Sequence, residues 1–225
     1  MRRYEASINT LTKEEIIKLK DLKVAVIGCG GLGGYIIEEL ARLGVGTIKL
    51  VDDDEFSISN LNRQLMSNEE NIGKSKVLEA KLRISKVNSE VTIIPFLKRF
   101  TFKNAEGILH DIDIVFDATD NIVSRIDLEE ECESRNIPII HGAINGWYGQ
   151  VCIVIPGSKR LSKLYKSEDM MCQYQQLGNP SFTPPIVASI QINEFVKYLF
   201  NKGLTLTEKV LFIDLLNHEY VLTDV

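Results

Sequence analysis

The chain has 225 residues, of which 44% are hydrophobic and 25% are charged, and its formal net charge is -5. The length suits one large domain, and the acidic balance argues against broad, sequence-independent nucleic-acid binding, which needs basic patches. The longest apolar runs are far too short to span a bilayer, so we expect no membrane association.

The N-terminal segment and the cysteines are typical of a cytoplasmic protein. The first 15 residues, MRRYEASINTLTKEE, have no apolar stretch after their arginines and so do not form a signal peptide. The cysteines at positions 29, 132, 152 and 172 are scattered and form no C-x-x-C pair. This pattern suits reduced thiols and gives no structural zinc site.

Short apolar strands alternate with helices up to residue 143. The predicted strands are residues 23–28, 47–52, 91–96, 113–118 and 137–143, and the predicted helices are residues 31–43, 74–88 and 120–134. Strands separated by helices form a mostly parallel sheet with both faces covered. We therefore predict a Rossmann-like α/β fold.

The pattern changes after residue 143. Residues 148–156 and 210–225 are expected to form strands in antiparallel association, which would extend the sheet in the C-terminal part. Between them lie a polar stretch, 157–183, and a helix that begins at Pro184 and Pro185 and ends at Gly203. No linker divides the chain, so we predict a single domain over residues 1–225.

The sequence GCGGLGG follows the first strand and opens the first helix. Its glycines allow a tight turn and let backbone N–H groups approach phosphate oxygens. The spacing Gly28-x-Gly30-x-x-Gly33 matches the dinucleotide pattern, and Asp52 ends the next strand, where a ribose hydroxyl would bind. A close strand–helix contact would need glycines too, but the strand, the helix and the acid together favour a nucleotide site.

The residues that follow favour a triphosphate over a nicotinamide cofactor. Asn60, Arg63 and Gln64 come in a single turn, and Lys76 follows. Fixed cations and amide donors offset the charge of a triphosphate during attack. Asp120 lies just past a strand, where a carboxylate facing a triphosphate is a natural Mg²⁺ ligand. Taken singly, Lys76 could be a solvated surface charge and Asp120 a helix N-cap.

The chain resembles the ThiF/MoeB/HesA family, the bacterial relatives of the ubiquitin-activating enzymes. The matching motifs are GCGGLGG, VDDDEFSISNLNRQ, GKSK and TDN, in family order and spacing. The resemblance implies ATP- and Mg²⁺-dependent adenylation of the C-terminal glycine carboxylate of a small ubiquitin-like sulfur-carrier protein, with release of pyrophosphate. It also implies a homodimer, a nucleotide-binding part at about 20–143 and a carrier-binding part at about 144–225. The carrier and the sulfur donor are not identified by the sequence.

The resemblance also assigns the site residues. Arg63, Lys76 and Asp120 would be catalytic, and Asp120 would hold Mg²⁺. The expected nucleotide-binding residues are Gly28, Gly30, Gly31, Asp52, Asp54, Ser59, Asn60, Leu61, Asn62, Arg63, Gln64, Lys76 and Asn121. No general base is needed, because a carboxylate is already ionised at neutral pH.

Two positions bear on the chemistry. Ala6 stands where family members often carry an arginine that reaches into the partner's site in a dimer, although Arg2 or Arg3 could replace it by a shift. Many relatives have a cysteine in the region of Cys172. No histidine lies near Cys172 to activate it, so we expect adenylation without a thiol step.

Residues 141–151, HGAINGWYGQV, are expected to form the far wall of the site. We interpret His141 as a structural histidine, and Trp147 and Tyr148 either as a docking surface for the carrier or as internal packing. The three glycines of this stretch would leave room for a thin Gly-Gly tail. For the dimer, the apolar face of residues 32–43 together with the N-terminal segment could supply an interface.

Other classes of function remain open. One is an adenylating enzyme of the same fold that acts on a small molecule or on a carboxylate within tRNA. Another is an NAD-dependent oxidoreductase, which the glycine loop and Asp52 support and the SNLNRQ motif opposes. A catalytically silent partner-binding protein is a further alternative, opposed by Arg63, Lys76 and Asp120.

Overall fold

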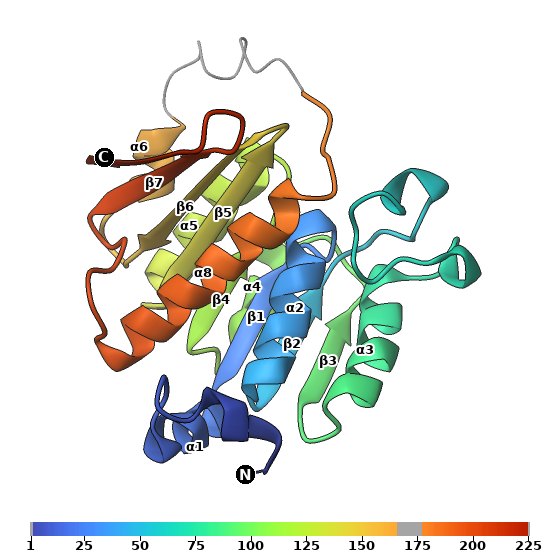
Figure 1. Cartoon of the computed structure of the whole chain (residues 1–225). Helices are drawn as coiled ribbons and strands as arrows, with labels where there is room; N and C mark the ends of the chain where they lie inside the picture. Colours follow the sequence, from blue (N-terminus) through green and yellow to red (C-terminus); the bar gives the residue numbers. More distant parts are fainter. Residues whose placement is uncertain (1, 166–176, 225) are drawn as a thin grey trace.

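One mixed sheet forms the centre of the molecule, and the computed structural model describes residues 2–165 and 177–224 (Figure 1). Within these residues eight strands lie in the order β3-β2-β1-β4-β5-β6-β7-β8. They are β1 (Lys23–Ile27), β2 (Thr47–Val51), β3 (Thr92–Phe96), β4 (Ile114–Asp117), β5 (Ile139–Asn145), β6 (Tyr148–Val154), β7 (Lys209–Asp214) and β8 (Glu219–Asp224). Pairing is parallel from β3 to β5 and antiparallel from β5 to β8. The predicted Rossmann-like fold with its antiparallel extension is confirmed.

Helices cover both faces of the sheet (Figure 1). In the figure α2, α3 and α8 lie on one face and α4, α5 and α6 on the other, and α1 packs at the amino ends of the strands. The helices are α1 (Lys13–Asp21), α2 (Gly31–Leu43), α3 (Lys76–Val87), α4 (Phe102–Leu109), α5 (Ile122–Ser134), α6 (Arg160–Leu164) and α8 (Thr183–Phe200), with 3-10 turns η1 (Arg2–Ser7), η2 (Ile58–Asn60) and η3 (Glu69–Asn71). No described helix combines the length and apolar character that crossing a bilayer requires.

Three of these helices, α1, α4 and α6, were not predicted from the sequence. α1 begins with a capping box: Thr12 Oγ1 accepts the Glu15 N–H at 3.2 Å, and the Glu15 carboxylate accepts the Thr12 N–H at 2.8 Å. The T-x-x-E pattern is a signal that identifies such a helix start. α4 is 8 residues long and α6 is 5, so neither is long enough to establish a helical period.

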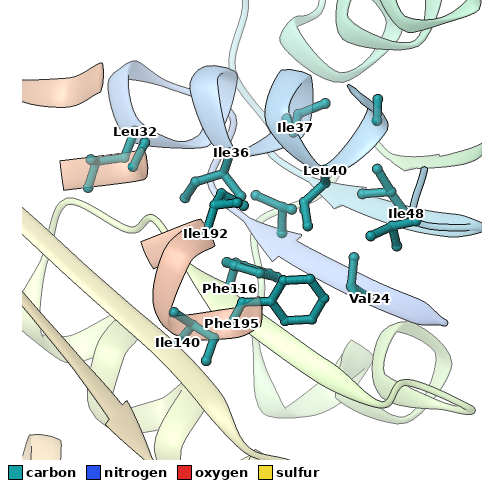
Figure 2. Close-up of a cluster of buried hydrophobic side chains, with 14 of the residues drawn as sticks. Val24, Leu32, Ile36, Ile37, Leu40, Ile48, Phe116, Ile140, Ile192 and Phe195 are labelled. Carbon is teal, nitrogen blue, oxygen red and sulfur yellow. The ribbon is translucent and has the colours of Figure 1, made fainter. Parts of the chain in front are cut away.

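The larger core cluster fills the space between α2, α8 and the sheet. Figure 2 shows the cluster, to which α2 contributes Leu32, Ile36, Ile37 and Leu40, α8 contributes Ile192 and Phe195, and the strands contribute Val24, Ile48, Phe116 and Ile140. Phe116 and Phe195 meet edge to face with ring centroids 5.3 Å apart. This contact fixes α8 over the centre of the sheet.

This packing corrects the expected dimer interface. Ile36, Ile37 and Leu40 have no exposed surface, and Leu32 is 5% exposed. The apolar face of residues 32–43 is therefore used within the chain, against α8 and the strands. The expectation that it supplies a dimer interface is wrong, because helix α8 already covers it.

The first turn of α2 packs so closely on the preceding glycine turn that it requires a glycine at position 33. A Cβ atom there would lie 1.9 Å from the Gly28 carbonyl oxygen. We predict that Gly33→Ala lowers the free energy of unfolding by about 3 kcal/mol, measured by urea denaturation. The control is Gly107→Ala within α4, where an added Cβ meets nothing within 4 Å. This control should raise stability by about 0.5–1 kcal/mol, and equal effects of the two changes would contradict the close contact.

Candidate active site

Four segments meet at the carboxyl ends of the parallel strands. They are residues 28–31 after β1, 52–75 after β2, 118–121 after β4, and 177–182 before α8. In the sheet, β2 and β3 lie on one side of β1, whereas β4 and β5 lie on its other side. The strand order therefore changes direction at β1. Open α/β sheets bind ligands at such a switch point.

The glycine turn lies directly against the end of β4. Gly28 has a φ of +94°, and a Cβ there would lie 2.5 Å from the Ala118 carbonyl oxygen. Packing within the chain therefore accounts for Gly28, as it does for Gly33. Gly31 differs, because it is the first residue of α2 and a Cβ on it would make only ordinary contacts, 3.6 Å from Pro184. A glycine not required by the fold is consistent with the close approach of a ligand.

The N-terminus of α2 has the character of an anion site. Its N-cap is Gly30, and no side chain within the described residues caps it. The first N–H groups of the helix point toward the open edge and carry its positive partial charge, which favours phosphate. The predicted phosphate role of Gly30 and Gly31 remains a prediction that this geometry supports.

Asp52 holds two loops together. Its Oδ2 accepts the Cys29 N–H at 2.7 Å, and its Oδ1 accepts the Asp54 N–H at 2.8 Å. Burial raises the pKa of Asp52, while the hydrogen bond from Cys29 and the charge of Lys76 act in the opposite direction. The sequence predicts only a ribose-binding role for Asp52, and the structure adds a second role in fixing the glycine turn to the end of β2.

Lys76 is a buried cation held by a carboxylate. Its side chain is 7% exposed, and its Nζ lies 2.7 Å from Asp54 Oδ2. Lys76 also begins α3, and its N–H donates to the Asp54 carbonyl at 3.0 Å. The interpretation of Lys76 as a solvated surface charge is wrong. Contact with a triphosphate remains a prediction for Lys76, and nucleotide binding remains a prediction for Asp54, whose carboxylate is 62% exposed.

Residues 58–64 fold back on themselves and place Arg63 beside the first residue of α2, its Cγ lying 3.9 Å from a Cβ placed on Gly31. Arg63 Nη1 donates to the Ser59 carbonyl and to Asn62 Oδ1, both at 2.9 Å. The Asn60 side chain accepts the Ser57 N–H at 3.0 Å, so its oxygen holds the turn. Asn62 Nδ2 donates to the Asn179 carbonyl at 3.0 Å and ties the turn to the segment before α8.

Gln64 is the buried member of this turn. It is 7% exposed and lies over Gly30, its Nε2 being 3.6 Å from a Cβ placed on that glycine. Its Oε1 has no hydrogen-bond partner among the described residues. A buried amide oxygen without a partner is costly, which suits a site completed by a ligand. Leu61, by contrast, is 37% exposed, and its only hydrogen-bonding groups are those of its backbone.

The structure separates the roles of Asp120 and Asn121. Asn121 is the N-cap of α5, and its side chain accepts the Ser124 N–H at 2.8 Å. Asp120 is exposed, and its Oδ1 accepts a long 3.3 Å hydrogen bond from Asn121 Nδ2. The interpretation of Asp120 as the helix cap is wrong. Its accessible carboxylate fits the oxygen ligand that Mg²⁺ prefers.

A second group of carboxylates, Asp52, Asp53 and Asp54, brings oxygens within 4.8 Å of one another. Both Asp52 oxygens accept backbone N–H groups, and Asp54 pairs with Lys76. Asp53 lies 3.8 Å from the Arg99 guanidinium. These partners account for the cluster, so we assign no metal to it.

The far wall differs from the expectation. A Cβ on Gly142 would lie 2.3 Å from the Gln191 side chain, and one on Gly149 would lie 2.4 Å from Val187. These glycines therefore leave space that side chains of α8 fill. Gly146 forms the β5–β6 turn with a φ of +61°. The expected channel for a Gly-Gly tail at these glycines is therefore wrong, because side chains occupy the space.

Other residues singled out in the sequence have clear positions. His141 is fully buried and hydrogen-bonded, so its structural role is confirmed. Trp147 packs against Phe182 with ring centroids 4.6 Å apart, yet it remains 42% exposed, so packing and docking both stay open. Cys29 and Cys132 are buried, as expected of packing residues. Cys172 lies outside the described residues.

The N-terminal arginines lie at the other end of the sheet. Arg2 and Arg3 belong to η1, which packs beside α1 at the amino ends of the strands (Figure 1). Tyr4 fixes η1 there, because its buried hydroxyl accepts a 3.0 Å hydrogen bond from Asn88 Nδ2 at the end of α3. Neither Arg2 nor Arg3 therefore belongs to the site of its own chain.

The sequence of this chain is similar to those of a known family and of several of its members. The sequence model of the ThiF family matches residues 4–224. The molybdopterin-synthase adenylyltransferase of Haemophilus influenzae is 32% identical over 202 residues, 88% of this chain and 82% of that protein. The sulfur carrier protein ThiS adenylyltransferase of Bacillus subtilis is 35% identical over 143 residues, 63% of this chain and 43% of that protein.

A different activity is named for another relative. The tRNA threonylcarbamoyladenosine dehydratase of Bacillus subtilis is 42% identical over 136 residues, 59% of this chain and 54% of that protein. Among solved structures, Escherichia coli MccB with ATP has a TM-score of 0.78 and 22% identity. The match covers 93% of this chain and 65% of MccB, slightly under two thirds, and shows a shared fold.

The N-terminus of α2 can be tested through Gly31. We predict that Gly31→Ala weakens ATP binding at least about 10-fold in a calorimetric titration, because a methyl group displaces the phosphates from the helix N–H groups. The free energy of unfolding should stay the same or rise by up to about 1 kcal/mol, since alanine favours the helix. Gly107→Ala, the control in α4, should leave ATP affinity unchanged. An unaltered Kd in Gly31→Ala would remove this helix end from the site.

Proposed function

The chain belongs to the ThiF family, and on this premise we propose that it transfers the adenylyl group of ATP to the C-terminal glycine carboxylate of a small ubiquitin-like sulfur-carrier protein. The family match spans residues 4–224, and the relatives named as adenylyltransferases include one for a sulfur carrier. Family membership favours adenylation over the oxidoreductase alternative.

The observation that carries the proposal is the meeting of three features at one sheet edge. The uncapped N-terminus of α2 lies beside Arg63, and the loop with Asp120 packs against the same glycine turn. Together they form a surface of donors and cations next to an accessible carboxylate. This combination suits a magnesium-bound triphosphate.

The proposed reaction joins two anions, so charge neutralisation and alignment dominate it. A carboxylate oxygen of the carrier attacks the α-phosphorus of ATP, and a new P–O bond forms. The bond between the α-phosphorus and the bridging oxygen breaks, and pyrophosphate leaves with the electron pair. No proton moves, so the site needs no general base. In this proposal Arg63, Lys76 and the α2 N–H groups offset the charge that develops at the phosphates.

Asp120 would hold Mg²⁺, which when bound offsets phosphate charge. The carboxylate suits this role because its one hydrogen bond among those described is long and it faces solvent. Asn121 supports the position of Asp120 by capping α5. In the same proposal Asp52 binds the ribose in addition to holding the glycine turn.

The proposal includes a homodimer in the cytoplasm. Arg2 and Arg3 lie at the opposite end of the sheet from their own site, so any contact that they make with a bound nucleotide would be with the site of a second copy (Figure 1). Three cysteines, at positions 29, 132 and 152, are free and buried, as expected in a reducing compartment. We also keep the division into a nucleotide-binding part at about 20–143 and a carrier-binding part at about 144–225.

None of the described cysteines supplies a nucleophile. Burial raises the pKa of the Cys152 thiol to about 12, and burial likewise raises the pKa of Cys29 and of Cys132. A thiolate is the reactive form of cysteine, and these thiols stay protonated at neutral pH. Adenylation requires no thiol, so the proposed reaction ends at the acyl-adenylate and the sulfur donor acts separately.

A second candidate is adenylation of a carboxylate within tRNA. It is favoured by the 42% identity over 136 residues to a tRNA threonylcarbamoyladenosine dehydratase. The net charge of -5 opposes it, because tRNA binding needs a positive surface. The same exchange assay distinguishes the two substrates.

The proposal predicts carrier-dependent exchange of labelled pyrophosphate into ATP. Asp120→Ala should reduce the exchange rate at least about 100-fold, because phosphate charge is no longer offset. Cys172→Ser should retain exchange near the wild-type rate. As a control, Asp21→Ala removes an exposed carboxylate at the end of α1 and should change nothing.

Two outcomes would contradict the proposal. One is exchange that requires threonylcarbamoyladenosine-containing tRNA and ignores a carrier ending in Gly-Gly. The other is a thiol-sensitive adduct between carrier and enzyme that is lost in Cys172→Ser, which would make Cys172 a nucleophile.

A further inference from the structure

A buried polar cluster lies beneath the loop that carries Asp120. We name it the Asp117 cluster, and its members are Asp117, Arg125, His141, Gln150 and Tyr165. Each is at least nine-tenths buried, and they come from β4, α5, β5, β6 and the residue after α6. The proposed reaction assigns no role to any of them. Burying five polar side chains is costly unless each is satisfied, so the cluster needs an explanation.

The cluster forms hydrogen bonds with all three polar groups of Thr119, the residue before Asp120. Asp117 Oδ1 accepts the Thr119 N–H at 2.9 Å and the Thr119 hydroxyl at 2.7 Å. Arg125 Nη2 donates to the Thr119 carbonyl at 2.9 Å. On the other side of Asp120, Asn121 is fixed as the N-cap of α5. The backbone of Asp120 is therefore held from both directions while its carboxylate stays accessible.

The Tyr165 hydroxyl connects the other members of the cluster. Arg125 Nη1 donates to it at 3.0 Å, and the Gln150 amide also contacts it. His141 Nε2 lies 3.0 Å from the same hydroxyl, and His141 Nδ1 lies 2.7 Å from Asp117 Oδ2. The Arg125 guanidinium also packs against the Tyr165 ring, 5.2 Å from its centroid.

One arrangement of protons satisfies these contacts. Asp117 is ionised and accepts from His141 Nδ1, so the neutral His141 ring accepts the Tyr165 hydroxyl proton at Nε2. The Tyr165 oxygen then accepts from Arg125 and Gln150. Burial has the largest effect on the pKa of His141 and the net result is a lowered pKa, although the neighbouring Asp117 acts to raise it. Burial acts to raise the pKa of Asp117, but its polar partners, among which the His141 hydrogen bond has the largest effect, together outweigh burial and lower the pKa.

We propose that Tyr165 is a positioning residue that, through Arg125 and His141, fixes residues 118–121 and thereby the Asp120 carboxylate. Only one part of this proposal, the role of Asp120 in holding Mg²⁺, rests on the proposed function. Without the Tyr165 hydroxyl, His141 loses a donor and Arg125 loses the acceptor that aims it at Thr119. The hydrogen bonds that hold Thr119 then weaken, although the apolar packing of the core is unchanged.

The first test measures loop order without any ligand. In Tyr165→Phe, hydrogen exchange of the peptide spanning residues 117–125 should be about 10-fold faster than in the wild type, because hydrogen bonds to charged groups are lost. A peptide from residues 36–43 of α2 should exchange at the wild-type rate. Tyr198→Phe in α8 is the matched control and should change neither peptide.

The second test measures the consequence for the site. The Mg²⁺ concentration that half-saturates its effect on ATP binding should rise about 10-fold in Tyr165→Phe, while ATP affinity in EDTA stays at the wild-type value. If Tyr165→Phe does not fold, Thr119→Val removes the hydroxyl bond to Asp117 and should give the same two changes.

Unchanged exchange in residues 117–125, or equally faster exchange in α2, would overturn the proposal. Faster loop exchange with an unaltered Mg²⁺ requirement would overturn it too. If the wild-type chain binds ATP identically with and without Mg²⁺, the proposed role of Asp120 fails. Hydrogen exchange alone then decides whether Tyr165 fixes the loop.

Discussion

The close approach of two backbones at the ends of β1 and β4 is the contact on which the site depends. Gly28 allows it, since a Cβ there would lie 2.5 Å from the Ala118 carbonyl oxygen. Because β1 and β4 are neighbours whose helices lie on opposite faces, the N-terminus of α2 and the loop before α5 open at the same edge. On one side of this edge the N-terminus of α2 offers N–H donors, and on the other side Asp120 offers a carboxylate. A nucleotide with a bound cation needs both.

Charges at this edge are fixed before any ligand binds. Lys76 pairs with Asp54, Arg63 donates to the Ser59 carbonyl, and both Asp52 oxygens accept backbone N–H groups. In the proposed reaction these side chains would lose little freedom on binding, so their interactions could act on the transition state. Beneath this edge, the buried Asp117 cluster holds Thr119 in place beside Asp120 through three hydrogen bonds.

Local patterns explain which features the sequence could predict. The strand, the glycine turn, helix α2 and Asp52 lie within one contiguous segment, and the periodicity of that segment determines its structure. Partners distant in sequence were not predictable. Asp117 and Tyr165 each lie 24 residues from His141, so the sequence indicated a structural histidine without naming its partners. The glycines of β5 and β6 suggested room for a tail, but α8, some 40 residues further on, fills that room.

The central claim is that a carrier carboxylate attacks the α-phosphorus of ATP at this sheet edge. It is tested most directly with a Gly-Gly carrier whose C-terminal carboxylate contains the heavy isotope of oxygen. The carrier is incubated with the enzyme, ATP and Mg²⁺, and the acyl-adenylate is cleaved at its acyl carbon with hydroxylamine. We predict that the released AMP contains one heavy oxygen atom, because the carboxylate oxygen forms the bridge to phosphorus. AMP without the heavy isotope, or a carrier that is never adenylated, would contradict the account.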